Sequence, residues 1–371
     1  NNADQPRGIV VGGLDGGDSA DGLEIRNNTV TNVEGGAADK DQAHAIQILE
    51  ESSGGGLIEN VVVDGNTIES ITDTRSTVAV NFNGKIEGEI TNNDISGLNT
   101  EGNPNDVDPG GGFTQVIALT KGGNAADGPQ NVAIEGNDIS DIETTAPQEA
   151  INFAPPRHIH IGSDADAETI SIENNDFSAD SVDPRGDVYV GGNTGGLNLD
   201  AILNDQGNTF DRAVAIENET GTLQTGIGSS VQLAVDQASP GDTISVGPGT
   251  FDESVTIDTE GVTVEGPNAG IAGDSDQRGA EATITDANGR LVIEASNVTI
   301  DGFNFEFNED AIQSKSGEDN LITNSRFELT GDTSDQYAIR VGGGSPGTDV
   351  TNNLFTDIVS SDGTEGDNVD G

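Results

Sequence analysis

The stretches VAIEGNDI (132–139) and ISIENNDF (170–177) carry the pattern that decides the fold. In each, apolar and polar residues alternate, an Asn follows a Gly or another Asn, and a bulky apolar residue stands two positions later. Period-two alternation is typical of a β-strand that sends every second side chain to one face. Asn tolerates the left-handed backbone region that a tight corner requires. Each stretch therefore predicts a strand, an asparagine corner and a second strand.

The same pattern recurs along the chain. It is found in LEIRNNTV (23–30), VVVDGNTI (61–68), GEITNNDI (88–95), LITNSRF (321–327) and DVTNNLF (349–355), and in related form in GNTF (207–210) and VTIDGFNF (298–305). Further short strands follow these copies, such as AIQIL (45–49), VAVNF (78–82), VIALT (116–120), AINFA (150–154), VYVGG (188–192) and AIRVGGG (338–344). One short unit repeated with loops of variable length predicts a solenoid, in which apolar side chains and asparagines stack from one repeat to the next.

The segment SSVQLAVDQASPGDTISVGPGTF (229–251) is of another kind. Val231, Ala234, Val235 and Ala238 follow the spacing of an amphipathic helix, and Ser229 or Ser230 can cap its start. The segment is similar to the one that covers the first coil in right-handed parallel β-helices of the pectin-lyase-like class. The resemblance implies an all-β fold, a right-handed parallel β-helix (solenoid) with a short amphipathic capping helix near 229–239. A cover is needed because an open coil end exposes strand edges and the apolar stack.

This capping segment lies in the middle of the chain. We therefore expect residues 1–225 to be the C-terminal coils of one parallel β-helix, and residues 226–371 to be the capping helix and N-terminal coils of a second one. The last residues joined to the first resemble the ordinary coil at 137–154, which suggests one period of a tandem array or a subunit whose end completes the next subunit's coil. Either arrangement gives an open head-to-tail filament. The plain alternative is one protein cut at convenient points.

Composition indicates the setting in which the chain works. It has 66 Asp and Glu against 14 Lys and Arg, a formal charge of −52, which excludes unassisted binding to nucleic acid or anionic lipid. Molar salt reduces the Debye length to about 3 Å and so screens such a surface. The acidic, Lys-poor composition resembles haloarchaeal proteins. Disorder is the alternative, but hydrophobic residues make up 32% and form short alternating clusters, so we expect a folded, salt-adapted protein.

The chain contains no Cys and no stretch long enough to span a bilayer. It contains no Met and shows no signal peptide, so we expect a processed or excised segment whose targeting and anchoring signals lie elsewhere. We expect an extracellular location at the cell surface, with no membrane insertion within this segment.

Few residues suggest chemistry. His158 and His160 stand two apart on a predicted strand, which would put both imidazoles on one face and could bind a metal; a plain polar strand face is the favoured interpretation. His44 is isolated, and the glycine runs 191–192 and 342–344 are interpreted as turns. The Asp-rich loops 15–22 and 103–110 have the oxygen ligands that Ca²⁺ prefers, so structural calcium is the one ion considered and the metal ligands stay unknown. Sequons predict glycosylation at Asn27, Asn218 and Asn297.

Catalytic and cofactor-binding residues are not predicted. The resemblance brings in lyases and hydrolases that cleave polysaccharides, but the Asn-Thr-Asp, paired Asp-Asp, Gly-His-Gly and Arg-Ile-Lys sets of the polygalacturonase type are missing. Basic residues are scattered singly, so we expect no basic cluster that could hold an acidic sugar; the arginines in different predicted coils are Arg26, Arg75, Arg185, Arg290, Arg326 and Arg340. The sequence predicts a non-enzymatic structural or adhesive surface protein that self-associates and binds surface glycans. A polysaccharide-binding or -cleaving β-helix and a halovirus tail fibre or spike are the alternatives.

Overall fold

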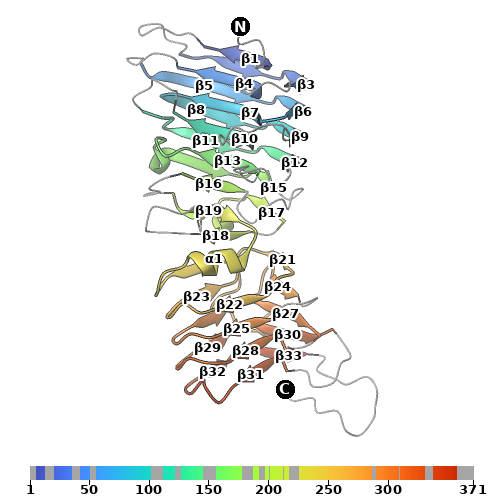
Figure 1. Cartoon of the computed structure of the whole chain (residues 1–371), viewed down its shortest axis with the longest axis vertical. Coiled ribbons are helices and arrows are strands. Elements are labelled where there is room, and N and C mark those ends of the chain that lie inside the picture. The colour runs from blue at the N-terminus through green and yellow to red at the C-terminus, as the bar shows by residue number, and fades with distance from the viewer. Residues whose placement is uncertain are drawn as a thin grey trace. The chain divides into compact units, whose positions relative to one another are not determined.

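A computed structural model describes residues 6–12, 21–35, 42–50, 56–101, 112–121, 127–144, 156–177, 187–191, 197–199, 201–211, 213–216, 225–285, 290–308, 310–330 and 337–356. These residues are predominantly β-strands, so the all-β prediction is confirmed (Figure 1). The chain divides into two compact units. Unit 1 contains residues 1–209 and 224–228, and unit 2 contains residues 210–223 and 229–371.

Unit 1 is built from three sheets, in which each strand up to β14 that has a partner further along the chain pairs with the strand three places on, while β15 pairs with β17 (Figure 1). Sheet A contains, in spatial order, β1 (Arg7–Val11), β4 (Ala43–Leu49), β7 (Ser76–Asn83), β10 (Phe113–Thr120), β13 (Arg157–Ile161), β16 (Val188–Val190) and β19 (Thr225–Gly228). Sheet B contains β2 (Glu24–Arg26), β5 (Ile58–Asp64), β8 (Ile86–Thr91), β11 (Val132–Glu135) and β14 (Ile170–Glu173). Sheet C contains β3 (Thr29–Glu34), β6 (Thr67–Asp73), β9 (Asp94–Thr100), β12 (Asp138–Thr144), β15 (Asp176–Phe177) and β17 (Thr209–Phe210).

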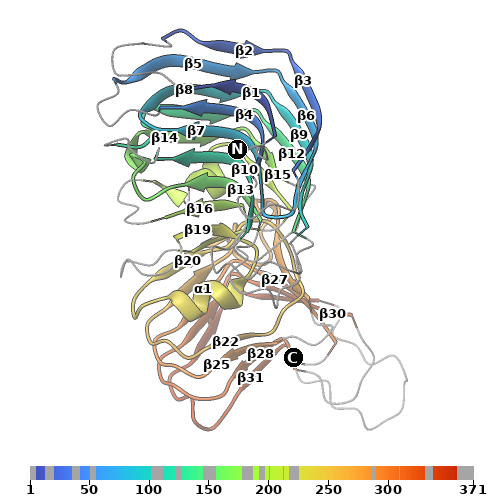
Figure 2. The ribbon, with the colours of Figure 1, turned by 45° about the horizontal axis from the view of Figure 1, so that its top comes forward.

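All three sheets are parallel, apart from the antiparallel pair of β16 with β19. Figure 2 shows β3, β6, β9, β12 and β15 following one another along one side of unit 1. A 3₁₀ turn (Ala167–Thr169) and a π-helical segment (Ala201–Asp205) lie in the connections.

The corner between sheets B and C is a column of asparagines, as the sequence predicted. Its members are Asn28, Asn66, Asn93, Asn137, Asn175 and Asn208, and the side-chain amide of each donates to the Oδ1 of the next at 2.9–3.1 Å. The residue before each has positive φ: Asn27, Gly65, Asn92, Gly136, Asn174 and Gly207. Gly and Asn alternate at this position because both tolerate the left-handed region.

The core of unit 1 consists of columns of aliphatic side chains in register. Ile68, Ile95 and Ile139 occupy one column in sheet C and are fully buried. Besides the corner residues, one residue inside each of β3, β6, β9 and β12 has positive φ: Asn32, Ser70, Gly97 and Asp141. It resets the alternation, so that residues three apart, such as Ile68 and Ile71, are both buried.

Unit 2 repeats the plan with three parallel sheets. Sheet D contains β20 (Thr243–Ser245), β23 (Thr263–Glu265), β26 (Thr299–Asp301), β29 (Leu321–Thr323) and β32 (Asp349–Thr351). Sheet E contains β21 (Gly249–Phe251), β24 (Ala282–Thr285), β27 (Asn304–Phe307), β30 (Arg326–Leu329) and β33 (Leu354–Thr356). Sheet F contains β22 (Val255–Ile257), β25 (Leu291–Ile293), β28 (Ile312–Ser314) and β31 (Ile339–Val341). The short strand β18 (Val214–Ile216) bridges to Val246.

The predicted amphipathic helix is present as α1 (Val231–Gln237), shorter than the range 229–239. Val231, Ala234 and Val235 are buried, and the Ser230 hydroxyl accepts from the Leu233 N–H at 3.2 Å. The Glu253 carboxylate completes the start of the helix: it accepts from the Ser230 hydroxyl at 2.8 Å and from the Val231 N–H at 2.7 Å. A carboxylate is favourable there because the first helical N–H groups have no partner within the helix.

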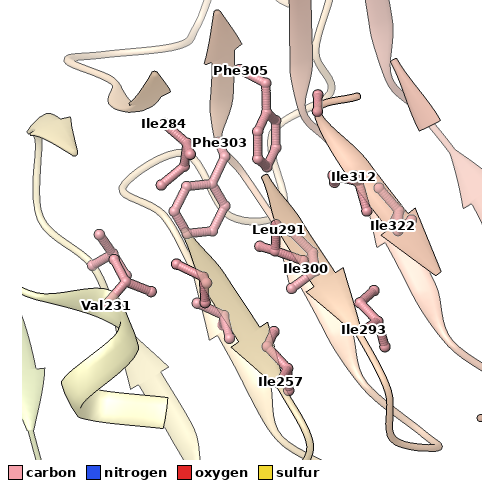
Figure 3. Close-up of a cluster of buried hydrophobic side chains, with 14 of the residues drawn as sticks. Val231, Ile257, Ile284, Leu291, Ile293, Ile300, Phe303, Phe305, Ile312 and Ile322 are labelled. Carbon is pink, nitrogen blue, oxygen red and sulfur yellow. The ribbon is translucent and has the colours of Figure 1, made fainter. Parts of the chain in front are cut away.

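The core of unit 2 adds aromatic rings to the aliphatic columns (Figure 3). Phe305 stacks on Phe327 with ring centroids 4.9 Å apart, and Phe327 stacks on Phe355 at 5.0 Å. Ile257, Ile293 and Ile300 extend the apolar interior toward the other two sheets. The corner between sheets D and E uses Ser325 and Asn353, which accept from the backbone N–H of Phe303 and Ser325 respectively.

Candidate functional site

Acidic residues are distributed unevenly among the sheets. Every strand of sheet B carries at least one Asp or Glu, whereas the strands of sheet A that the structure describes carry none. The same holds in unit 2, where β22, β25, β28 and β31 of sheet F lack acidic residues. In a chain with 66 acidic residues, sheet A of unit 1 and sheet F of unit 2 thus differ from the other sheets, because their described strands carry no Asp or Glu.

One face of sheet A is polar, and we call it the polar face of sheet A. Its residues are Arg7, His44, Gln47, Asn81, Gln115, Arg157, His160 and Tyr189. They form two columns: Arg7 pairs with His44, and Gln115 with Arg157, in the first column; Gln47 pairs with Asn81, and His160 with Tyr189, in the second. Val78 interrupts the first column and Ala118 the second. Neither column contains a carboxylate, and His44, Gln47, Asn81, Gln115 and Arg157 are buried.

The most tightly organised part of this face is the group Arg157, His160 and Tyr189. The Arg157 guanidinium donates to His160 Nδ1 at 2.7 Å and lies 3.5 Å from the centroid of the Tyr189 ring. The His160 ring stacks on the same tyrosine, with centroids 5.0 Å apart. Burial and then the charge of Arg157 lower the pKa of His160 to about 3, so the imidazole is neutral at pH 7 and its Nε2 carries the proton.

His44 and Gln47 form a second group on the polar face. Burial, followed by the charge of Arg7, lowers the pKa of His44 to about 4, so this imidazole is also neutral. Its Nε2 lies 3.4 Å from the Gln47 amide nitrogen. The Gln47 Oε1 is buried and accepts no hydrogen bond among the described residues.

The two neighbouring histidines have different surroundings, which corrects the expectation that they share a face. His158 is buried against Phe177, with ring centroids 5.6 Å apart, and its Nδ1 lies 3.0 Å from Asp187 Oδ1. His160 instead faces Tyr189. Pairing along sheet A skips one residue at the same place in each strand, at Gly8, Ala45, Ala79, Val116 and His158, and this breaks the period-two alternation.

Arginines nevertheless meet in pairs, each pair at one carboxylate. Arg290 and Arg340 converge on the buried carboxylate of Asp310, at 3.6 and 3.7 Å. Arg326 and Arg278 meet at Glu281, and the buried Arg278 also donates to the carbonyls of Ile271 and Phe303. These arginines are distant in sequence, but parallel stacking brings adjacent strands to the same place. Of the other arginines named from sequence, Arg26 pairs with Asp64 through its guanidinium, and the backbone N–H of Arg75 donates to Asp73. Arg185 lies outside the described residues.

The predicted glycosylation sites can be located in part. Asn27 and Asn297 are exposed at corners and have positive φ, and the Asn297 amide donates to Glu260 at 3.3 Å. Asn218 lies outside the described residues, as do loop 103–110 and residues 15–20 of the other Asp-rich loop. Among the residues that the structure describes, no group of three or more His, Asp or Glu could hold a metal ion. No described helix has the length and apolar character needed to cross a bilayer.

Comparison with known proteins gives no relative: no family model, no curated protein and no solved structure matches the chain. The polar face of sheet A was missed by sequence reasoning, because that reasoning searched for cationic clusters and metal ligands. The available signal was the lack of Asp and Glu in segments such as AIQIL (45–49) and VAVNF (78–82). An arrangement of neutral donors and acceptors of this kind can bind hydroxyl-rich ligands, and it lacks the paired carboxylates of sugar hydrolysis.

Proposed function

We propose that the chain is part of a salt-adapted, extracellular β-helix protein that serves as a structural or adhesive element and associates with itself. In this proposal each unit winds as a right-handed parallel β-helix of the pectin-lyase-like type, and α1 covers the first coil of the second helix. The pairing of most strands with the third strand further on, together with the asparagine column at one corner, supports the winding.

One observation carries the structural role: side-chain stacks run from strand to strand in both units. The asparagine column follows the corner between sheets B and C of unit 1, and in unit 2 phenylalanines stack across β27, β30 and β33. Such columns distribute load over many short parallel strands, and they can be extended by adding further strands at an edge. The proposed role involves no catalytic residue and no cofactor. Structural Ca²⁺ is a candidate ligand of the Asp-rich loops.

Electron microscopy of purified protein and of native cell surfaces tests this function. We expect end-to-end particles in molar salt and labelling of the cell exterior by antibody. Trimers about one axis on virions would favour the tail-fibre or spike alternative. Monomers at all concentrations, combined with an intracellular location, would overturn the proposal. Mass spectrometry of native protein would test glycosylation at Asn27, Asn218 and Asn297.

The polar face of sheet A favours a second function, binding of a polysaccharide. His160 and Tyr189, which pair on adjacent strands of this acid-free sheet and are only partly buried, can offer a ring and hydrogen bonds to a sugar at the spacing of adjacent strands, about 4.8 Å. Isothermal titration with neutral and uronate polysaccharides in molar salt tests it. Tyr189→Leu should weaken binding several-fold, whereas Ser171→Ala on sheet B should leave it unchanged. Equal binding by both variants, or no binding to any glycan tested, would count against this function.

A further inference from the structure

We propose that the face of the Tyr189 ring turned toward β19 stacks on one sugar ring of a neutral polysaccharide, and that this sugar lies over the backbone of Gly226. The inference rests on the proposed polysaccharide binding by the polar face of sheet A. It adds to that function the place where the sugar binds, its orientation and the class of sugar. All the residues concerned belong to unit 1.

One face of the Tyr189 ring is covered within the protein. The His160 ring stacks on it at an interplanar angle of 9°, with centroids 5.0 Å apart, and the guanidinium carbon of Arg157 lies 3.5 Å from the tyrosine centroid. Arg157 also donates to His160 Nδ1 at 2.7 Å, so the imidazole and the guanidinium lie side by side over the same face. Groups on opposite faces would be separated by the tyrosine ring and could not form this hydrogen bond. Both residues belong to β13, so the covered face is the one turned toward β13.

The other face of the ring is turned toward β19, because β16 lies between β13 and β19 in sheet A (Figure 1). The residue of β19 that pairs with Tyr189 is Gly226, which has no side chain. Ile227 is buried and pairs with the buried Val188, so it points to the core. Gly228 then lies on the same side of the strand as Gly226, because side chains alternate along a strand. At neither position does β19 offer a side chain to cover the tyrosine.

The spacing of the stacked rings fits one further ring at this place. The centroids of His160 and Tyr189 are 5.0 Å apart, close to the distance between adjacent strands, about 4.8 Å. A ring over Gly226 would meet Tyr189 at the same distance, within the range of about 4.5–7 Å in which rings stack. The sugar would therefore continue the stack of His160 and Tyr189 by one strand.

Two polar groups of the same stack are available to a ligand. The Tyr189 hydroxyl and His160 Nε2 form no hydrogen bond within the described part of the chain, and neither belongs to its buried polar atoms without a partner. Both therefore reach solvent. Because His160 Nδ1 accepts from Arg157, Nε2 carries the proton and can donate to a sugar hydroxyl. The tyrosine hydroxyl can donate or accept.

The surrounding charges favour a neutral sugar. The formal charge of −52 on the chain repels anionic glycans. Arg157 is 9% exposed and lies over the covered face of Tyr189, so it is not placed to meet a sugar carboxylate over Gly226. The C–H face of a pyranose carries a small positive charge, which matches the negative face of an aromatic ring. Its hydroxyls match the polar groups of His160 and Tyr189.

Tyrosine emission tests the stacking, because the chain has two Tyr and no Trp. Tyr189 is the sole tyrosine in the full-length Tyr337→Phe variant. Its emission should change when the neutral probes cellohexaose, maltohexaose and mannohexaose are titrated in molar salt and one of them binds. The full-length Tyr189→Phe variant is the control: it keeps a ring and should still bind by calorimetry, while the emission of Tyr337 stays constant. Binding by calorimetry with unchanged emission of Tyr189 would overturn the stacking.

Filling the place over Gly226 provides the second arm. Full-length Gly226→Val puts a branched side chain beside Tyr189 and should weaken binding at least about tenfold, or 1.4 kcal/mol, with unchanged circular dichroism. Ser171→Val adds the same side chain to sheet B and should have no such effect. If Gly226→Val does not fold, the emission of Tyr189 decides alone.

The possible failures have different consequences. Unchanged affinity in a folded Gly226→Val variant would refute the binding place, and a preference for hexagalacturonate over every neutral probe would refute the class of sugar. In both cases, weaker binding by Tyr189→Leu would leave polysaccharide binding itself standing. If none of these glycans binds, the inference fails together with the function on which it rests.

Discussion

Single asparagines connect successive strands in unit 1, and Asn137 shows how much depends on each. Its Oδ1 accepts from both the backbone and side-chain nitrogens of Asn93, and its own Nδ2 donates to Ile90 O and Asn175 Oδ1. The residue is 1% exposed, so any group left without a partner would also lack water.

We therefore predict that Asn137→Ala lowers the free energy of unfolding by about 2–4 kcal/mol, because it leaves buried donors on Asn93 unpaired. Urea unfolding in molar salt, followed by circular dichroism, measures the change. Ser171→Ala, a truncation on the same unit with no corner role, should change it by less than about 0.5 kcal/mol. Similar losses for both variants would mean that the asparagine column is not a main source of stability.

His160 is expected to make the folded protein less stable in acid. Its pKa is lowered to about 3 in the folded protein by burial and by Arg157, while the unfolded chain titrates near 6.5. The folded state therefore holds the neutral form, and the stabilisation it provides is complete above pH 6.5 and is lost as pH falls toward 3. His160→Gln should flatten the dependence of the free energy of unfolding on pH between 6.5 and 4, by up to about 1.4 kcal/mol per pH unit. Lys315→Gln instead removes an exposed charge in unit 2 that pairs with Glu294, and an equal flattening in that variant would refute the assignment.

Neighbouring strands of sheet C place like charges opposite one another. Asp138 is paired with Asp94 on one side and Asp176 on the other. Burial, and then the charges of Asp176 and Asp94, raise the pKa of Asp138 above its usual value. A raised carboxyl pKa means that folding binds a proton, so this column loses stability as pH rises through that range, opposite in sign to His160.

We predict that Asp138→Asn stabilises the protein. At neutral pH and low salt it should raise the free energy of unfolding by about 0.5 kcal/mol, since like charges directly opposite are destabilising. The gain should shrink in molar salt. Glu89→Gln is the matched control, because its strand neighbours are Val62 and Ala133. A gain of the same size in Glu89→Gln would show that general charge reduction, rather than the column, is responsible.

The elements predicted from sequence are those fixed by local chemistry. Alternation and the Asn corners predicted the strands around VAIEGNDI and ISIENNDF, and the i, i+3, i+4 spacing predicted α1, although its last predicted turn is extended at Ala238. What failed depended on pairing between distant strands. The skipped residue at His158 and the meeting of Arg290 with Arg340 arise only once the strands stack in register, and no local pattern contains that register.

For the molecule as a whole, net charge decides the conditions under which these sheets are stable. The acidic residues of unit 1's strands lie on sheets B and C, where adjacent strands bring them about 5 Å apart. At 0.01 M salt the Debye length is about 30 Å, so each carboxylate repels many others, whereas at 1 M it is about 3 Å and only direct neighbours still interact. With a formal charge of −52, the repulsion summed over the chain exceeds any single pair.

We predict that raising NaCl from low to molar concentration increases the melting temperature by at least about 10 °C, equivalent to roughly 8 kcal/mol for a chain of this size. Differential scanning calorimetry at pH 7 measures it. Sucrose, which favours compact states without screening charge, is the control and should give a much smaller gain than salt. If dialysis into low salt left the melting temperature unchanged, the acidic surface would not act through repulsion. The stacked columns would then hold the sheets together without help from screening, and the salt-adapted interpretation would have to be abandoned even though the fold remained.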